Sequence, residues 1–429
     1  MPAVPAVLSD DYVERCLWQS QVDPPERTPG PLPDRADVVV VGAGLCGLAA
    51  ADTFARLGRS VVVIEREPLG WGASSRNGGM VIPELKAGPR TLEQRYGPVG
   101  LRMHAEVVEA FEYVRDLATG DDPVECSWAE PGMLLVAHST RHVAAVRGLV
   151  DELTEVGESA HVVERNDLHT EIGSDAFVAG AVVERTGSVQ PAALHAGLAR
   201  RALHAGAEVF DRTALRSVRP LTVGHEVVTT RGVVRAAEVV LATNATADAA
   251  VPHLERRVLP VGSYIIATEV LPADLAASVL PTGRMVFDTR NFLAYWRLTP
   301  DGRLAYGGRR NMDPTDVADA RDFLYDQMVA VHPQLAGVPV THAWGGAVCV
   351  TLDRLPHVGQ VDGAWYATGC NGSGVALNTW LGHRLAESIC GEAPLPACAE
   401  LRHRRIPFHS FRSAYLPWVG RYLSLEDAR

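Results

Sequence analysis

VVVVGAGLCG, residues 38–47, is the stretch that decides the fold of this chain. Val38–Val41 is a continuous β-branched run, which predicts a strand buried on both faces, as in a parallel sheet covered by helices. After the glycine-rich turn, residues 45–57 have the pattern of a helix with a small apolar packing side. Ser60–Ile64 then predicts a second buried strand. Together these segments predict one βαβ unit.

The three glycines of the turn have separate expected roles. Gly42 permits the tight turn, Gly44 lets backbone approach a pyrophosphate, and Gly47 allows close packing of helix on strand. The free N–H groups of the following helix point at the phosphates. Glu65 ends the second strand, where an acid is expected to bind ribose hydroxyls. The pattern predicts a dinucleotide site, to which we also assign Leu45, Cys46 and Arg66.

Two further segments favour FAD over NAD. Residues 72–79, GASSRNGG, combine small residues with a fixed cation and suit a backbone that wraps an extended cofactor. Residues 369–374, GCNGSG, lie between an expected strand and a helix, so their N–H groups can stabilise negative charge on a reduced flavin. The candidate contacts are Gly72, Ala73, Ser74, Arg76, Asn77, Gly78, Gly79, Gly369, Asn371, Gly372, Ser373, Gly374 and Val375.

These residues resemble the D-amino-acid oxidase/glycine oxidase superfamily of FAD proteins, and within it the γ-glutamylputrescine oxidase-type amine oxidoreductases. The matching pieces follow the family's order through most of the chain. They are VVVVGAGLCGL at the start, WGASSRNGG at 71–79, PELKAGP at 83–89, RTGSVQPAALHAGLARRALHAGAEV at 185–209, VVLATNA at 239–245, YWRLTPDGRLAYGGR at 295–309, WGG at 344–346, DRLPHVG at 353–359 and GCNGSGVALNTWLG at 369–382.

The resemblance implies an α/β plus α+β fold, in which a discontinuous Rossmann-like FAD domain joins a substrate domain built on an antiparallel sheet. It implies hydride transfer to flavin N5 from a carbon next to nitrogen. The imine is then hydrolysed, and O2 reoxidises the flavin to give H2O2. It adds Val218, Thr243 and Asn244 to the cofactor residues. Relatives with covalent flavin often carry a histidine where this chain has Arg76, and the spacing from Cys349 to the D-x-x-P stretch is short. We therefore expect non-covalent FAD.

Expected domain boundaries follow from proline density, strand patterns and the resemblance. We expect an N-terminal arm at 1–35, an FAD domain at 36–90, 160–250 and 345–398, a substrate domain at 91–159 and 251–344, and a C-terminal tail at 399–429.

Three residues are candidates for the chemistry. Lys86, the only lysine, follows the flavin loop and could stabilise anionic reduced flavin or superoxide, or be a solvated loop residue. By strand alternation Arg297 should point the same way as Tyr295, and it could hold a carboxylate bidentately or form a structural salt bridge. Tyr295, with Tyr264 and Trp296, could form an aromatic wall around an amine or pack in the core.

Composition excludes several classes of function. The net charge of −11 argues against nucleic acid as a partner. The seven cysteines contain no C-x-x-C pair and the histidines have no ligand spacing, so we expect no zinc or other metal site. There is no signal-peptide pattern and no apolar run approaching the roughly 18 residues of a membrane span, which favours a cytoplasmic protein.

The leading interpretation is therefore oxidation of the C–N bond of a small amine or amino-acid-like substrate, with O2 as acceptor. One alternative is a dehydrogenase that passes electrons to a quinone or a carrier protein. Its only support is the mixture of arginine and aromatic residues at 401–422, which could touch a membrane surface or a partner, or pack on its own protein. A tRNA-modifying flavoprotein is a further alternative, disfavoured by the acidic charge. The substrate's identity and the oligomeric state stay open.

Overall fold

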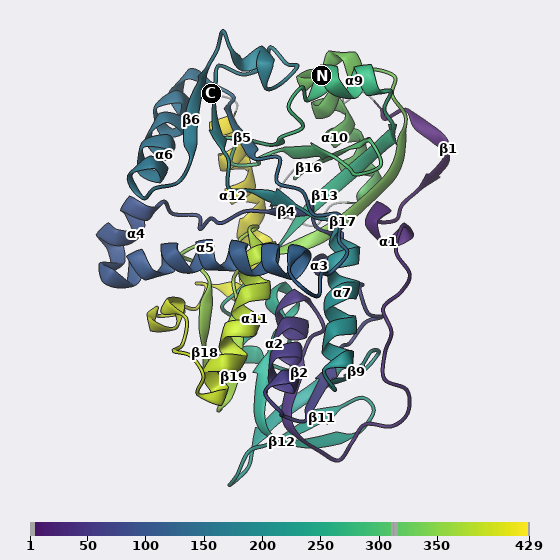
Figure 1. The fold of residues 1–429 in the computed structure, drawn as a ribbon, viewed down its shortest axis with the longest axis vertical. Coiled ribbons are helices and arrows are strands. Elements are labelled where there is room, and N and C mark those ends of the chain that lie inside the picture. The colour runs from purple at the N-terminus through teal and green to yellow at the C-terminus, as the bar shows by residue number, and fades with distance from the viewer. Residues whose placement is uncertain (1–4, 310–311, 313–315, 428–429) are drawn as a thin grey trace.

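The computed structural model describes residues 5–309, 312 and 316–427. In this part of the chain the strands form an eight-stranded sheet, a nine-stranded sheet and a two-stranded ladder. The eight-stranded sheet and its helices make up the lower half of Figure 1, and the nine-stranded sheet the upper half. The fold is therefore a dinucleotide-binding unit joined to a largely antiparallel unit, as the sequence predicts.

The eight-stranded sheet is organised around the predicted valine strand. Its strands are β2 (Arg35–Val41), β3 (Val61–Ile64), β9 (Glu208–Phe210), β10 (Leu215–Pro220), β11 (His225–Thr229), β12 (Val233–Leu241), β18 (His357–Val361) and β19 (Ala364–Thr368). Strands β9, β3, β2, β12 and β19 pair in parallel, in that order. Val38 and Val40 join one buried core, whereas Val39 and Val41 join another on the opposite face. A strand buried on both faces explains the continuous valine run.

Four long helices pack on the first of these faces. They are α2 (Leu45–Arg56), α5 (Pro98–Thr119), α7 (Pro191–His204) and α11 (Gly374–Cys390), and all contribute to one core cluster. Helices α2 and α11 lie in close contact, because a Cβ on Gly382 would overlap the carbonyl oxygen of Cys46. The first turn of α2 thus packs against the middle of α11.

The nine-stranded sheet has the order β1-β17-β13-β16-β15-β14-β5-β7-β6. The bounds are β1 (Leu8–Val13), β17 (Val340–Val350), β13 (Leu259–Val270), β16 (Arg303–Gly308), β15 (Tyr295–Leu298), β14 (Met285–Asp288), β5 (Met133–Ala137), β7 (Ala179–Val183) and β6 (Ala160–Glu164). All its pairings are antiparallel except β1 with β17 and β14 with β5.

The remaining α-helices and one two-stranded ladder complete this description of the chain. The helices are α1 (Leu17–Ser20), α3 (Ala73–Arg76), α4 (Pro89–Tyr96), α6 (Val143–Glu155), α8 (Pro252–Glu255), α9 (Ala273–Val279), α10 (Val317–Val331) and α12 (Arg412–Asp427), and the ladder is β4 (Met80–Val81) with β8 (Gly187–Ser188). Among these residues no helix combines the length and apolarity needed to cross a bilayer.

The strand pairings differ from the expected domain boundaries in four places. The arm at 1–35 contributes β1, which pairs with β17, so it is part of the nine-stranded sheet. Strands β6 and β7 join the same sheet, although 160–250 was expected in the FAD domain. Strand β17 runs to Val350, beyond the boundary expected at 345. Helix α5, expected in the substrate domain, packs in the core of the eight-stranded sheet. Pairing between distant segments decides these memberships, and local patterns carry no information on it.

Candidate active site

The glycine turn is shaped by steric contacts at each of its three glycines. Gly42 has a φ of +104°, and a Cβ there would lie 2.9 Å from the carbonyl oxygen of Ala242. A Cβ on Gly47 would overlap the carbonyl oxygen of Gly42. A Cβ on Gly44 would lie 2.8 Å from Ser74 Oγ. Gly42 and Gly47 therefore have the predicted roles, and Gly44 admits the 72–79 loop to the N-terminus of α2.

Two acceptors organise the backbone N–H groups around this turn. Ser74 Oγ accepts a hydrogen bond from Leu45 N at 3.0 Å. The Glu65 carboxylate accepts from Ala43 N at 2.9 Å and from Glu67 N at 2.9 Å. Glu65 is thus fixed at the carboxyl end of β3 next to the turn, where the sequence predicts a ribose-binding acid.

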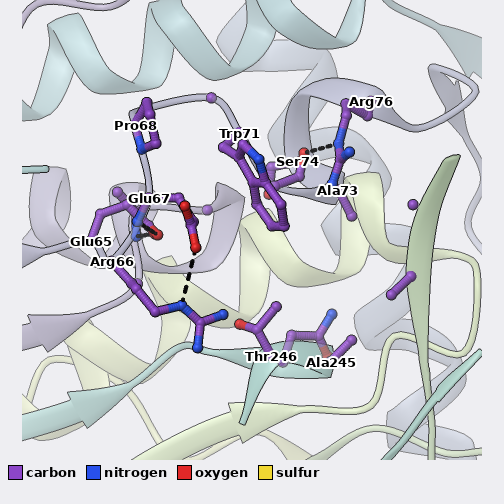
Figure 2. A pocket seen from close by; sticks show the side chains of 18 of the residues that line it. Glu65, Arg66, Glu67, Pro68, Trp71, Ala73, Ser74, Arg76, Ala245 and Thr246 are labelled. Carbon is purple, nitrogen blue, oxygen red and sulfur yellow. Dashed lines mark hydrogen bonds and ion pairs between the residues drawn. The ribbon is translucent and has the colours of Figure 1, made fainter. Parts of the chain in front are cut away.

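A cavity of about 850 Å³ opens over this turn. Segments 41–44, 64–76, 242–251 and 344–347 contribute to its wall. In Figure 2 the 65–76 segment follows one side of the cavity, and Ala245 and Thr246 lie across from Trp71. The predicted residues in this wall are Gly42, Gly44, Glu65, Arg66, Gly72, Ala73, Ser74, Arg76, Thr243 and Asn244.

Two buried polar atoms of residues in this wall lack a hydrogen-bond partner among the described residues. His195 Nε2 donates to the carbonyl oxygen of Ala43 at 2.7 Å, and burial lowers the pKa of His195, so the ring is neutral. Its Nδ1 and the Thr243 hydroxyl have no partner among the described residues. The N-terminus of α2 and the carboxylate of Glu65 supply the kinds of donor and acceptor that a dinucleotide such as FAD requires.

A second cavity, of about 520 Å³, adjoins the first. Ala73, Arg76, Trp344, Gly346 and Ala347 line both cavities. The predicted residues in the wall of the smaller cavity are Ala73, Arg76, Asn77, Gly78, Lys86, Tyr295, Asn371, Gly372, Ser373 and Val375. The structure therefore brings the 72–79 loop and the 369–374 turn to the smaller cavity, and the 72–79 loop also lines the larger one.

Lys86 is held against the turn that precedes α11. Its ammonium pairs with the carboxylate of Glu84, which also accepts from Ser373 Oγ at 2.6 Å. Although burial alone would raise the pKa of Glu84, Lys86 and Ser373 hold it below its ordinary value. Lys86 is therefore not a solvated loop residue, and its charge is partly compensated by Glu84.

Tyr295 and Arg297 point the same way, as alternation predicts, but differ in their surroundings. The Tyr295 ring lies against Gly78 and Gly307, and its hydroxyl is 3.1 Å from Ser263 Oγ. Arg297 is 3% exposed and is absent from the walls of both cavities among the described residues. Its guanidinium donates to the carbonyl oxygens of Gly78 at 2.8 Å and Val189 at 2.6 Å.

The environment of Arg297 does not support the prediction that it holds a carboxylate. Burial lowers its pKa to about 10, so the guanidinium stays charged at neutral pH and lies 5.2 Å from the centre of the Trp18 ring. Its donors fix the 78–79 backbone to the start of α7. Trp296, on the other face of β15, packs in the core with Phe177 and Tyr306, and does not form an aromatic wall.

Sequence reasoning did not single out Arg309, a cation of the smaller cavity. Arg309 comes directly after β16. It lines the smaller cavity together with Arg290 and Arg354. Arg290 pairs with the buried Asp288. In contrast, no ion pair joins Arg309 or Arg354 to an acid in the described part of the chain, and Arg309 Nε has no hydrogen-bond partner there. Burial lowers the pKa of Arg309, as does the neighbouring Arg354.

Other predicted residues lie beside the cavities and not in their described walls. Val218 in β10 pairs with Val227 and is not in the described wall of the larger cavity, which Thr213 and Leu215 of the same region reach. The remaining predictions shape the turns behind the walls: Leu45, Cys46, Gly47, Gly79, Gly369 and Gly374. Cys349 is buried with its thiol 3.5 Å from Thr368 Oγ1 and is also outside both walls. No group of potential metal ligands occurs among the described residues.

The glycine turn after a parallel strand and the acid that ends the next strand are features of a dinucleotide-binding protein. The chain belongs to the FAD dependent oxidoreductase family, whose model matches residues 37–388. It is 32% identical over 399 residues to gamma-glutamylputrescine oxidoreductase of Escherichia coli K12, covering 91% of this chain and 92% of that relative.

Solved structures show the same fold. Glycine oxidase from Geobacillus kaustophilus superposes with a TM-score of 0.73 at 22% identity, covering 87% of this chain and 100% of that one. L-amino acid deaminase from Proteus vulgaris superposes with a TM-score of 0.70 at 21% identity, covering 90% and 97% of the two chains. These superpositions agree with the membership of the chain in the FAD dependent oxidoreductase family.

Proposed function

We propose that this enzyme oxidises the C–N bond of a small amine that carries a carboxylate. The observation that carries this proposal is the smaller, cationic cavity, which meets the dinucleotide cavity at a shared wall. FAD supplies the hydride acceptor at N5. The amine loses a hydride from the carbon next to nitrogen, and water hydrolyses the resulting imine to a carbonyl compound and an amine. O2 then accepts the two electrons from the reduced flavin and forms H2O2.

Charge in the smaller cavity favours an anionic group on the substrate. Its described wall contains five cations, Arg76, Lys86, Arg290, Arg309 and Arg354, and one acid, Glu84. A simple diamine would be repelled, whereas a carboxylate is attracted and can accept two parallel hydrogen bonds from one guanidinium. Arg309 is the proposed carboxylate ligand because its Nε has no other partner among the described residues.

The remaining wall supports positioning and exclusion of water. Met80, Ile82, Phe287 and Phe292 are apolar, and the ring of Tyr295 is fixed between two glycines. A rigid, dry pocket that orients a C–H bond supplies much of what hydride transfer needs from the protein. The names of the relatives, a γ-glutamylputrescine oxidoreductase, a glycine oxidase and an L-amino acid deaminase, support an amine or amino acid as substrate.

We further propose that FAD is bound without a covalent link and that the enzyme is cytoplasmic. Arg76, where covalent relatives often have a histidine, offers no nucleophile for the flavin. Burial raises the pKa of the Cys349 thiol to about 12, which keeps it protonated. All seven cysteines are free, as is usual in a reducing compartment.

The test is an anaerobic titration of the yellow protein, followed at flavin wavelengths, with amino acids, N-alkyl amino acids and unsubstituted diamines. We expect bleaching by carboxylate-bearing amines and none by diamines, followed by rapid recovery of colour and peroxide formation in air. Bleaching by diamines alone would contradict the role of Arg309. Slow recovery in air without peroxide would instead identify a dehydrogenase with another acceptor.

A further inference from the structure

Helix α12 is fixed on the protein by one of its faces. Leu416 and Gly420 are buried on this face, and Leu423 continues it and lines the smaller cavity. At the end of the helix, the Asp427 carboxylate accepts hydrogen bonds from Asn291 N at 2.8 Å and from Phe292 N at 3.0 Å. The helix is therefore a defined part of the fold, in contrast to a loose tail.

The opposite face of the same segment exposes large apolar side chains. Trp418 follows Leu416 by two positions, about 200° around a helix, and is 70% exposed. Leu425, two positions after Leu423, is 64% exposed, and before the helix Phe408 and Phe411 are 78% and 67% exposed. Single exposed apolar residues are ordinary, but four such residues in one short segment indicate a contact surface.

Charge in this segment is opposite in sign to that of the whole chain. Residues 402–425 contain no aspartate or glutamate and five arginines, Arg402, Arg404, Arg405, Arg412 and Arg421, whereas the chain has a net charge of −11. Arginine interleaved with tryptophan, phenylalanine and leucine is the composition of segments that lie in the interface of an anionic bilayer. The absence of a spanning helix among the described residues limits such contact to one leaflet surface.

We propose that residues 402–425 bind the enzyme peripherally to an anionic lipid bilayer. The exposed aromatic and leucine side chains enter the headgroup region, and the arginines pair with lipid phosphates. A second copy of the chain is a poorer occupant, because a two-fold contact would bring two sets of arginines together. Leu423 faces the substrate cavity from the inner side of α12, so the bilayer surface would lie about one helix diameter, roughly 10 Å, from that cavity.

The test is co-sedimentation of the full-length, FAD-loaded enzyme with vesicles of phosphatidylcholine alone or mixed with phosphatidylglycerol. We expect binding to the mixed vesicles, little binding to pure phosphatidylcholine, and release at high salt. Arg404→Gln with Arg405→Gln should weaken binding about fivefold for each arginine removed. Phe411→Ser with Trp418→Ser should weaken it further.

A matched control comes from the far end of the molecule. Arg216 and Val223 are exposed in and beside β10, and Val223 is 85% exposed. Arg216→Gln with Val223→Ser should bind vesicles as the unmodified enzyme does. Equal binding by the Arg404/Arg405 and control variants would overturn the proposal, as would no binding to anionic vesicles. A dimer seen by light scattering that Trp418→Ser dissociates, without vesicle binding, would assign the surface to a second copy and also overturn it.

Discussion

The two cavities are built by different means. The larger one is formed mainly by backbone that turns sharply after parallel strands, and its key positions, Gly42 and Gly47, exclude any side chain. The smaller one is formed largely by side chains from β13, β14, β15, β17 and the 369–374 turn, which are distant in sequence. Sharp backbone turns can be recognised in the local sequence, whereas the direction of a side chain depends on what packs around it. The wall of the larger cavity was therefore predictable, and most of the wall of the smaller cavity was not.

The sharpest contrast within the smaller region is between Arg297 and Arg309. They lie on or just beyond the adjacent strands β15 and β16, and neither has an acidic partner among the described residues. Arg297 donates hydrogen bonds to backbone carbonyl oxygens and lines neither cavity among the described residues, whereas Arg309 lines the smaller cavity. Substitutions at the glycine turn and at these arginines should separate a cofactor defect, a stability defect and a substrate defect.

The largest effect is expected at the glycine turn. Gly47→Val places a branched side chain where even a Cβ would overlap the carbonyl oxygen of Gly42, so strand and helix must move apart. We expect loss of bound FAD and of most soluble protein, measured as the ratio of flavin to protein after purification. The matched control is Gly148→Ala in α6, where nothing lies within 4 Å of the new Cβ. Purification of Gly47→Val with a normal flavin content would contradict the view that the larger cavity depends on the backbone geometry of this turn.

The next effect is on stability. Arg297→Met leaves the carbonyl oxygens of Gly78 and Val189 without their donor, at a cost of about 3 kcal/mol for two unsatisfied buried acceptors. Urea unfolding should show this loss, while the affinity for a carboxylate ligand in the remaining folded enzyme changes little. If Arg297→Met unfolds with a normal free energy but no longer binds a carboxylate ligand, the prediction that Arg297 holds a carboxylate would be supported instead.

A smaller effect, confined to binding, is expected at Arg309. Arg309→Met should weaken binding of a simple monocarboxylate such as propionate about 30-fold, because a charge-assisted hydrogen bond contributes about 2 kcal/mol. Perturbation of the flavin spectrum during titration measures this affinity. Unfolding free energy and FAD content should stay near normal, and Arg309→Lys should have an intermediate affinity, since it keeps the charge and loses the planar fork. Unchanged propionate binding would contradict the proposed role.

The smallest effect concerns Lys86 and pH. Because the pKa of Glu84 is held low, the ion pair contributes stability above about pH 4.5, the ordinary value for glutamate, and this stability is lost as pH falls through the lowered pKa. Lys86→Met should therefore cost about 1 kcal/mol at pH 7, as for a partly exposed pair, and less at pH 4. The measurement is the melting temperature of Lys86→Met and of the unmodified enzyme at pH 7 and at pH 4. A difference between the two proteins that is larger at pH 4 than at pH 7 would contradict the expected direction.

Local sequence patterns predicted the strands and the helix of the βαβ unit beside the larger cavity. The expected helix at 45–57 is observed as Leu45–Arg56, and the expected strands around it are observed within a few residues. Burial on both faces explains why the valine run was informative. Ser74 and Glu65 were also predictable, because they lie on segments that directly follow the βαβ unit.

Contacts that join distant segments were not predictable. Alternation showed that Tyr295 and Arg297 share a face, and it could not show that the carbonyl oxygen of Val189 would reach Arg297. The Gly307-Gly308-Arg309 run was visible as a strand end, but its direction toward the cavity depends on β13 and β15 beside it. The proline-rich arm gave no sign that Cys16 and Gln19 would line the larger cavity.

Strand β1 has a consequence for how the protein is made. Its partner β17 begins at Val340, so the first strand has no neighbour in the sheet until more than three quarters of the chain has left the ribosome. At typical rates of synthesis this delay is roughly 15 to 65 seconds. Strand β1 must stay unpaired during that time, as must α1 beside it, which contributes to the wall of the larger cavity. That wall can therefore be completed only after β17 has been synthesised.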